Sequence, residues 1–230
     1  MRYFIILFFL SGCFFANAQA TNTKNDSIPY ELSKQAFIYS AARSYNDPIM
    51  ARAALYNLLA YNPRNTSVLD SLAKSYYEYQ QYASAALVAQ DAIKLNPDDI
   101  FAIEIAAAAF DNLGVKIRAI ANYEKLYLAE NDMTILYKIA FLQYETKRYG
   151  ESINNINTIF ESSEADKLQL IFPTDSGQNQ AISLKAATNR LYAMLEEDRG
   201  NTDNAKNLYK KAIEMDPNFE LAKKQLAALK

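Results

Sequence analysis

The stretch that decides the fold is TSVLDSLAKSYYEYQQYASAALVAQDAIKLNPDD, residues 66–99. Apolar residues recur at helical spacing in both of its halves, as Leu69, Leu72, Ala73 and Tyr76, and then as Ala85, Ala89, Ala92 and Ile93. The closing Asn96-Pro97 pair indicates the end of a helix, because proline disfavours helical geometry in the residue before it. The stretch therefore predicts two amphipathic helices followed by a break.

The same pattern returns along the chain at intervals close to 34 residues. Pro63 and Pro97 lie 34 residues apart, in the matching contexts YNP and LNP. The recurring positions are Pro63, Pro97 and Pro217, together with Ala51, Ala85, Ala119 and Ala205, with Ser152 in place of one alanine. Because a two-helix unit does not bury its own apolar face, neighbouring units must stack, and the repeat predicts a solenoid.

These units resemble the tetratricopeptide repeat family, and we align them at 32–65, 66–99, 100–132, 133–165 and 186–219. The small eighth position of that family is matched by Ala73, Ala107, Ala140 and Ala193, and the twentieth by the alanines above. The twenty-seventh position carries Leu58, Ala92, Leu126, Ile159 and Ala212. The resemblance implies an all-α fold, an α-solenoid of about five helix–turn–helix units over residues 30–230.

Helix ends and an insertion complete the predicted organisation. Candidate N-caps are Asn65, Asp98, Asp132 and Asn218, and Gly114 and Gly200 are predicted to lie in the turns inside their units. A lysine-rich helix at 218–230 is predicted to cap the solenoid. Residues 164–184 are extra to the repeat, and their alternation around Pro173 to Gly177 favours a small β-hairpin. An irregular loop is the alternative.

The first 20 residues, MRYFIILFFLSGCFFANAQA, have the pattern of a secretory signal peptide. Arg2 precedes an apolar run that is too short to span a bilayer, and the small residues Ala18 and Ala20 offer cleavage sites. Residues 21–29 are then a polar, flexible leader. Leu10 to Cys13 resemble a lipobox, so a lipid anchor at Cys13 is a minority interpretation, as is an uncleaved membrane anchor. We predict export to the periplasm or association with the outer membrane.

The composition excludes several classes of function. The 230 residues include 24 Lys plus Arg, 26 Asp plus Glu, one Cys and no His. A formal charge of -2 gives no electrostatic case for binding nucleic acid, and the absence of imidazole removes the commonest acid–base and metal-binding groups. Glu196-Glu197-Asp198 is interpreted as the polar end of a helix, with a cation site as the alternative. We expect no cofactor, no metal and no catalysis.

In the family that the units resemble, the first helices of successive units line a concave groove. The resemblance implies twelve groove residues here: Tyr77, Glu78, Phe101, Glu104, Asp111, Tyr137, Phe141, Tyr144, Glu145, Arg190, Met194 and Glu197. Aromatic and acidic side chains dominate this set, which suggests a protein or peptide partner with basic and apolar side chains. The alternative is that the tyrosines only pack helix against helix.

The family's clamp for a C-terminal carboxylate is not recognisable in this chain. Lys74 and Arg190 lie three units apart, with Glu78 and Glu104 between them. The sequence therefore predicts a non-catalytic, exported scaffold for protein–protein interaction in the bacterial cell envelope. A self-assembling structural component of the envelope is the alternative.

Overall fold

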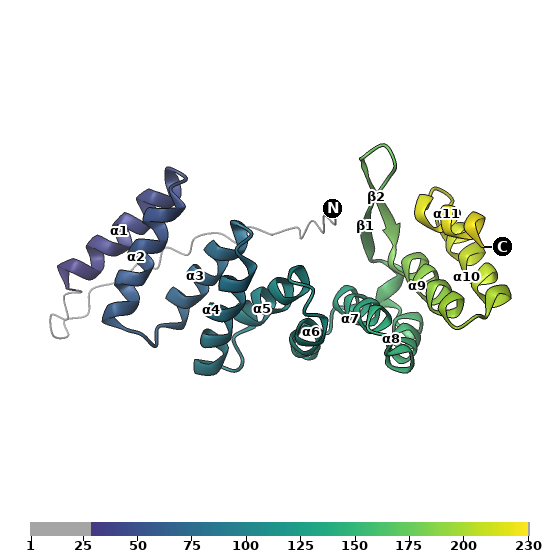
Figure 1. Cartoon of the computed structure of the whole chain (residues 1–230), viewed down its shortest axis with the longest axis horizontal. Coiled ribbons are helices and arrows are strands. Elements are labelled where there is room, and N and C mark those ends of the chain that lie inside the picture. The colour runs from purple at the N-terminus through teal and green to yellow at the C-terminus, as the bar shows by residue number, and fades with distance from the viewer. Residues whose placement is uncertain (1–28, 230) are drawn as a thin grey trace. The chain divides into compact units, whose positions relative to one another are not determined.

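A computed structural model of the chain describes residues 29–229 (Figure 1). Contacts within the chain divide it into two compact units, Met1–Tyr61 and Asn62–Lys230. The predicted signal peptide, Cys13 and the leader up to residue 28 lie outside the described residues. Among residues 29–229, no helix combines the length and the apolar character needed to cross a bilayer.

The described part of the first unit is a pair of helices. Helix α1 (Tyr30–Ser44) packs along α2 (Pro48–Tyr61). Its buried side chains are Ala42, Ala51, Ala54 and Leu55. Three of these four are alanines, which let the two backbones approach closely but bury little apolar surface.

The second unit is built from further helix pairs and a short sheet. Its helices are α3 (Thr66–Glu78), α4 (Tyr82–Leu95), α5 (Ile100–Asn112), α6 (Lys116–Glu130), α7 (Met133–Glu145), α8 (Tyr149–Glu161), α9 (Leu184–Asp198), α10 (Thr202–Met215) and α11 (Glu220–Ala228). From α3 to α11 each helix packs on the next, and α3 also contacts α5 as α7 contacts α9. The predicted fold class, an all-α repeat of helix pairs, is confirmed.

The small residues of the repeat lie at the closest approaches between helices. Ala73, Ala107, Ala140 and Ala193 on the first helices, and Ala85, Ala119, Ser152 and Ala205 on the second, all have an exposed fraction of 0%. Ser152 occupies a position where the other units have alanine. Its buried hydroxyl is satisfied, because Oγ donates to the carbonyl oxygen of Ala140 at 2.8 Å.

The turn inside each helix pair has one recurring geometry. In the α5–α6 turn, Gly114 has φ +73°, and the amide of Val115 donates to the carbonyl of Phe110 at 2.9 Å, as in a Schellman motif. The predicted glycine turns are thus confirmed. The equivalent position is left-handed in the other pairs as well, at Asn46, Gln80, Lys147 and Gly200.

The predicted N-caps are confirmed at two positions and corrected at two. Asn65 and Asp132 accept hydrogen bonds from the amides of Val68 and Thr134. In α5 the cap is Asp99 and not Asp98, because the Asn96 side chain accepts from the Asp98 amide and places Asp98 in the preceding turn. In α11 the cap position is Phe219 and not Asn218, and no side-chain bond caps that helix.

Most of the insertion forms the predicted hairpin. Strand β1 (Gln169–Pro173) pairs antiparallel with β2 (Asn179–Ser183), with Leu170 opposite Ile182, after a short 3-10 turn, η1 (Glu164–Asp166). Leu170 and Ile182 are buried, whereas their strand neighbours Gln169, Ile171 and Ala181 are exposed. The hairpin therefore has one face toward the core of the second unit.

Three sets of contacts hold the hairpin against α11 and the turn before it (Figure 1). The amide and hydroxyl of Ser183 donate to Oδ2 of Asp216 at 2.8 and 2.6 Å. The Phe172 ring lies 5.1 Å from that of Phe219. In the loop, Asp175 forms an ion pair with Lys224. The insertion is thus fixed along its whole length.

Candidate functional site

The first helices of the pairs in the second unit, α3, α5, α7 and α9, carry the predicted groove residues. Polar contacts join α3 to α5 and α5 to α7, and α9 packs on α7. Asn112 on α5 donates to the Tyr77 hydroxyl of α3 at 3.3 Å, and Lys138 on α7 pairs with Asp111 of α5 at 2.6 Å. The four helices therefore present one connected face, which we call the inner face.

The predicted residues differ widely in their access to solvent. Glu78 and Glu197 are exposed. Tyr137 and Arg190 are buried, with exposed fractions of 4% and 9%. The others are half-buried: Tyr77, Phe101, Glu104, Asp111, Phe141, Tyr144, Glu145 and Met194. Tyr137 and Arg190 therefore offer little surface to a partner.

Arg190 is covered by elements that lie outside the repeat. Its Nε donates to Oε1 of Gln225 on α11 at 2.6 Å, and its guanidinium carbon lies 5.9 Å from the ring centroids of both Phe172 and Phe219. Burial raises the pKa of the neighbouring Tyr137, and the Arg190 charge acts in the opposite direction. The hairpin and α11 thus close the inner face over the middle of α9.

Three of the predicted carboxylates are already paired with lysines, and the first of them is Glu78, whose Oε1 lies 4.0 Å from Nζ of Lys74. Asp111 is bound by Lys138, and Glu145 accepts from Lys116 at 3.2 Å. Glu104 differs, because burial raises its pKa, the charge of Glu130 adds to the increase and only Lys74 opposes it. The acidic character of the inner face is therefore partly neutralised at its centre.

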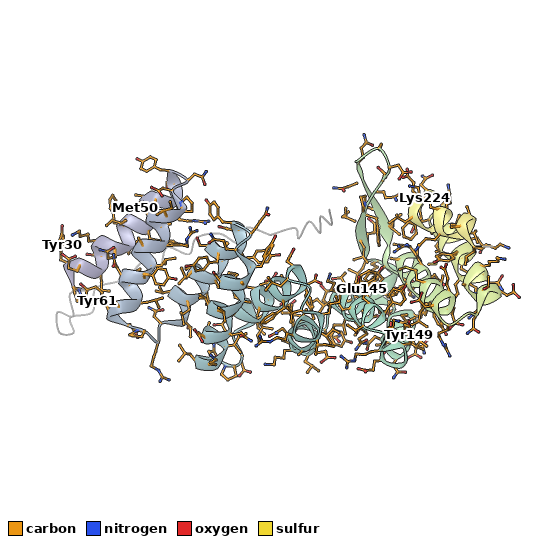
Figure 2. The ribbon with its side chains drawn as sticks, viewed as in Figure 1. Tyr30, Met50, Tyr61, Glu145, Tyr149 and Lys224 are labelled. Carbon is orange, nitrogen blue, oxygen red and sulfur yellow. The ribbon has the colours of Figure 1, made fainter. Side chains whose placement is uncertain are left out.

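The least neutralised part of the inner face lies around the C-terminal end of α9. We call five side chains there the tyrosine–carboxylate cluster: Tyr144, Tyr149, Glu197, Asp198 and Tyr209. Tyr149 donates to Oδ2 of Asp198 at 3.1 Å, and Tyr209 donates to Oε2 of Glu197 at 3.0 Å. The Tyr144 ring lies 6.3 Å from the rings of both Tyr149 and Phe141. Figure 2 labels Tyr149, a member of this cluster.

The electrostatics of the cluster keep its phenols protonated. Burial and the charge of Asp198 raise the pKa of Tyr144 to about 12. Burial and the charge of Glu197 likewise raise the pKa of Tyr209. Within residues 29–229, neither Glu197 nor Asp198 forms an ion pair with lysine or arginine. Two carboxylates thus stand beside aromatic rings without a cation.

Glu196, next in sequence to the cluster, has a different role. It is 4% exposed and accepts from Arg199, Asn201 and Asn204 at 2.8 to 2.9 Å. Burial favours the protonated acid, but the hydrogen bonds from Asn204 and Asn201 and the Arg199 charge together lower the pKa of Glu196. Glu196 therefore fixes the turn between α9 and α10. In the described part of the chain, no group of three metal-ligating side chains forms.

Sequence reasoning missed Tyr149 and Tyr209 as members of the site. Both lie on second helices, α8 and α10, whereas the groove positions that the resemblance implies are all on first helices. Their hydroxyls reach the inner face only because α8 and α10 each pack against α9. The repeat pattern holds no signal for these contacts.

Comparison with known proteins identifies the fold. The sequence matches no family model and no curated protein. Among solved structures, a tetratricopeptide repeat protein from Parabacteroides merdae ATCC 43184 is 17% identical, with a TM-score of 0.64 over 86% of this chain and 72% of its own. MamA is 16% identical, with a TM-score of 0.63 over 83% of this chain and 96% of its own.

A third similar structure is YrrB, a tetratricopeptide repeat protein with an unusual peptide-binding site. It is 14% identical, with a TM-score of 0.64 over 81% of this chain and 87% of its own. The chain thus has the fold of tetratricopeptide repeat proteins, and the resemblance read from its sequence is confirmed at the level of the fold.

Proposed function

We propose that the protein is a non-catalytic scaffold that binds a segment of another protein, bearing basic and apolar side chains, on the inner face of its second unit. The observation that carries this proposal is the tyrosine–carboxylate cluster, where Glu197 and Asp198 have tyrosine donors but no cationic partner in the described chain. A lysine or arginine from a partner supplies the missing charge.

The chemistry of the cluster suits such a side chain. A carboxylate has about four lone-pair sites, so one tyrosine hydroxyl leaves each carboxylate able to accept further hydrogen bonds. A cation over the face of an aromatic ring gains about 0.5–2 kcal/mol, depending on how far it is desolvated. Tyr144 and Phe141 offer half-buried rings for the apolar groups that flank the cation. Cation and apolar group are thus bound side by side.

The similar structures support a peptide or protein as the partner. YrrB has a peptide-binding site on the same fold, although an identity of 14% leaves its residues without counterparts to transfer. The inner face here is also interrupted by the hairpin at Arg190. We therefore propose that the bound segment lies over α3, α5, α7 and the C-terminal end of α9.

Selection of displayed random peptides on the purified protein, followed by fluorescence anisotropy with the selected peptide, tests this function. We expect enrichment of lysine or arginine next to aromatic or aliphatic residues. The double variant Glu197→Gln/Asp198→Asn is expected to weaken binding about tenfold, which corresponds to 1.4 kcal/mol. The matched control is Asp203→Asn, an exposed carboxylate in the first turn of α10.

A second pair of variants tests the aromatic part. Tyr144→Ala is expected to weaken binding of the selected peptide. Leu128→Ala, at a side chain of α6 that is 83% exposed, is expected to leave the affinity unchanged. Tyr137 is unsuitable for this purpose because its burial would confound binding with folding. Enrichment of acidic peptides, or unchanged affinity in both cluster variants, would contradict the proposal.

We further propose that the scaffold acts in the cell envelope, in the periplasm or at the outer membrane. The support is the signal-peptide pattern of residues 1–20, which lie outside the described residues. Mass spectrometry of the N-terminal peptide from fractionated cells tests it. Cleavage after Ala18 or Ala20 is expected, a lipid on Cys13 would favour the minority interpretation, and an intact Met1 in the cytoplasm would contradict export.

A further inference from the structure

The tyrosine–carboxylate cluster holds two acceptor groups near one aromatic ring. Tyr149 on α8 donates to Oδ2 of Asp198, and the Tyr209 hydroxyl on α10 fixes Oε2 of Glu197 in the same way. Burial raises the pKa of Tyr144, and the charges of Asp198 and Glu197 add to the increase, so both carboxylates lie near its hydroxyl. A cation placed on the Tyr144 ring is therefore within reach of two carboxylates.

The aromatic part of the cluster offers ring faces and no cage. The Tyr144 ring centroid lies 6.3 Å from those of Tyr149 and Phe141, with planes tilted by 33° and 50°. A group held between two facing rings needs about 3.5 Å to each, a separation of about 7 Å. The rings stand closer than that and do not enclose a compact ammonium group. They form a row of adjoining faces, on which a flat group stacks.

Arginine fits this arrangement better than lysine. A guanidinium is planar, stacks on aromatic faces and has five N–H donors in a fixed fork, whereas the lysine ammonium is a compact and more strongly hydrated charge. A guanidinium stacked on Tyr144 directs its donors outward in its own plane, toward the carboxylates beside the hydroxyl. An ammonium on the same ring loses water that the rings do not replace.

The second unit already binds one of its own arginines in this way. The guanidinium carbon of Arg190 on α9 lies 5.9 Å from the ring centroids of both Phe172 and Phe219. At the same time its Nε donates to Oε1 of Gln225 at 2.6 Å. Ring faces together with a nearby oxygen acceptor thus bind a guanidinium elsewhere on the same helix.

We propose, on the basis of the proposed function, that the cationic side chain bound at the cluster is an arginine of the partner and that the cluster discriminates against lysine. The guanidinium stacks on Tyr144 and donates to Asp198 and Glu197 at lone pairs that the tyrosine hydroxyls leave open. The methylene stem of the arginine lies along the half-buried Phe141 ring.

Matched peptides test this preference. The peptide selected on the purified protein is synthesised with arginine, lysine, citrulline or dimethylarginine at its cationic position, and each form is titrated by fluorescence anisotropy. We expect the lysine form to bind about fivefold more weakly than the arginine form. Dimethylarginine keeps the charge but loses donors, and is expected to weaken binding to a similar extent. Citrulline keeps the planar shape without the charge and is expected to bind most weakly.

A ring variant and its control locate the preference on Tyr144. Tyr144→Leu removes the ring face and keeps an apolar side chain, so the ratio of the lysine and arginine dissociation constants is expected to fall from about five to about one. Leu128→Ala, at a side chain of α6 that is 83% exposed, is expected to keep the ratio of the wild type. Circular dichroism checks that both variants keep their helices.

The outcomes separate this preference from the proposed function. Equal affinity for the arginine and lysine forms, tighter binding of lysine, or an unchanged ratio in Tyr144→Leu would overturn the arginine preference and leave cation binding at the cluster intact. Equal affinity for the citrulline and arginine forms, or selection of peptides without a cation, would overturn both.

Discussion

The hydroxyl of Tyr209, a side chain with an exposed fraction of 0%, donates to Oε2 of the exposed Glu197 across 3.0 Å. This bond joins α10 to α9 and runs from the core of the second unit to the tyrosine–carboxylate cluster. It holds the carboxylate in one orientation, and the nearby negative charge in turn raises the pKa of the phenol. The site is therefore positioned by the core and not by flexible surface side chains.

Tyr209→Phe removes this bond and keeps the ring. We expect the free energy of unfolding to fall by about 1.5–3 kcal/mol, the usual contribution of a hydrogen bond to a charged group. Urea denaturation followed by circular dichroism measures the change. Tyr45→Phe, at an 84% exposed side chain, is the control and is expected to leave the midpoint unchanged. Equal effects of the two substitutions would show that the bond contributes nothing.

Ser183→Ala tests how the hairpin is attached. The Ser183 hydroxyl donates to Asp216 at 2.6 Å and also accepts from the Ala186 amide at the start of α9. Loss of both bonds is expected to lower the free energy of unfolding by about 1–2 kcal/mol. Hydrogen exchange at the Ile171 and Ala181 amides is expected to become faster. The control, Ser67→Ala, changes an exposed serine in α3; comparable exchange in both variants would contradict the anchoring role.

Lys147→Gly is expected to stabilise the protein. Lys147 has φ +60° in the turn between α7 and α8, where Gly114 and Gly200 occupy the equivalent positions of other pairs. A residue with a Cβ is strained there by about 1–2 kcal/mol. Glycine removes this strain, but its greater freedom in the unfolded chain offsets part of the gain. We expect a net gain of about 0.5–1 kcal/mol in thermal or urea unfolding. Lys147→Ala keeps the Cβ and should show no gain.

Asp70 gives the protein a distinct dependence of stability on pH. Burial raises the pKa of Asp70 to about 6, and the charge of Asp99 contributes a smaller part of the increase. Oδ1 of Asp70 is buried without a hydrogen-bond partner. Because the pKa of an unfolded aspartate is about 3.9, the folded state binds more protons between roughly pH 4 and 6, so stability from this group is lost as pH rises.

Asp70→Asn is therefore expected to stabilise the protein at pH 7 and to make little difference at pH 4. The gain at pH 7 is about 1 kcal/mol after allowance for solvent screening of a half-exposed group. Thermal unfolding of both proteins at the two pH values measures it. A constant difference across the range would mean that Asp70 does not titrate as described.

Much of the fold follows from local pattern. The helix pairs, the buried small residues such as Ala73 and Ala140, and the hairpin after Leu168 are all visible as spacing or alternation. The start of α5 was misplaced by one residue because Asp98 and Asp99 both have the chemistry of a cap, and a turn closed by Asn96 selects between them. Which aspartate caps α5 therefore depends on backbone geometry, which the residue types alone do not specify.

The site was only partly visible in the sequence. The repeat places Tyr144 and Glu197 on first helices, and the structure has them on α7 and α9. The contacts of Tyr149 and Tyr209 were missed, as was the burial of Arg190, since each depends on an element far along the chain. Ion pairs such as Lys138 with Asp111 likewise arise only when neighbouring units stack.

The sequence by itself determined the class of architecture, because small residues at fixed intervals let helices pack closely, and units that cannot bury their own apolar faces must stack in order. Only the tertiary structure decided which inner-face residues remain open to a partner. Access depends on what covers a side chain. Arg190 is covered by Phe172 of the hairpin and by Gln225 of α11, and the repeat pattern predicts neither contact.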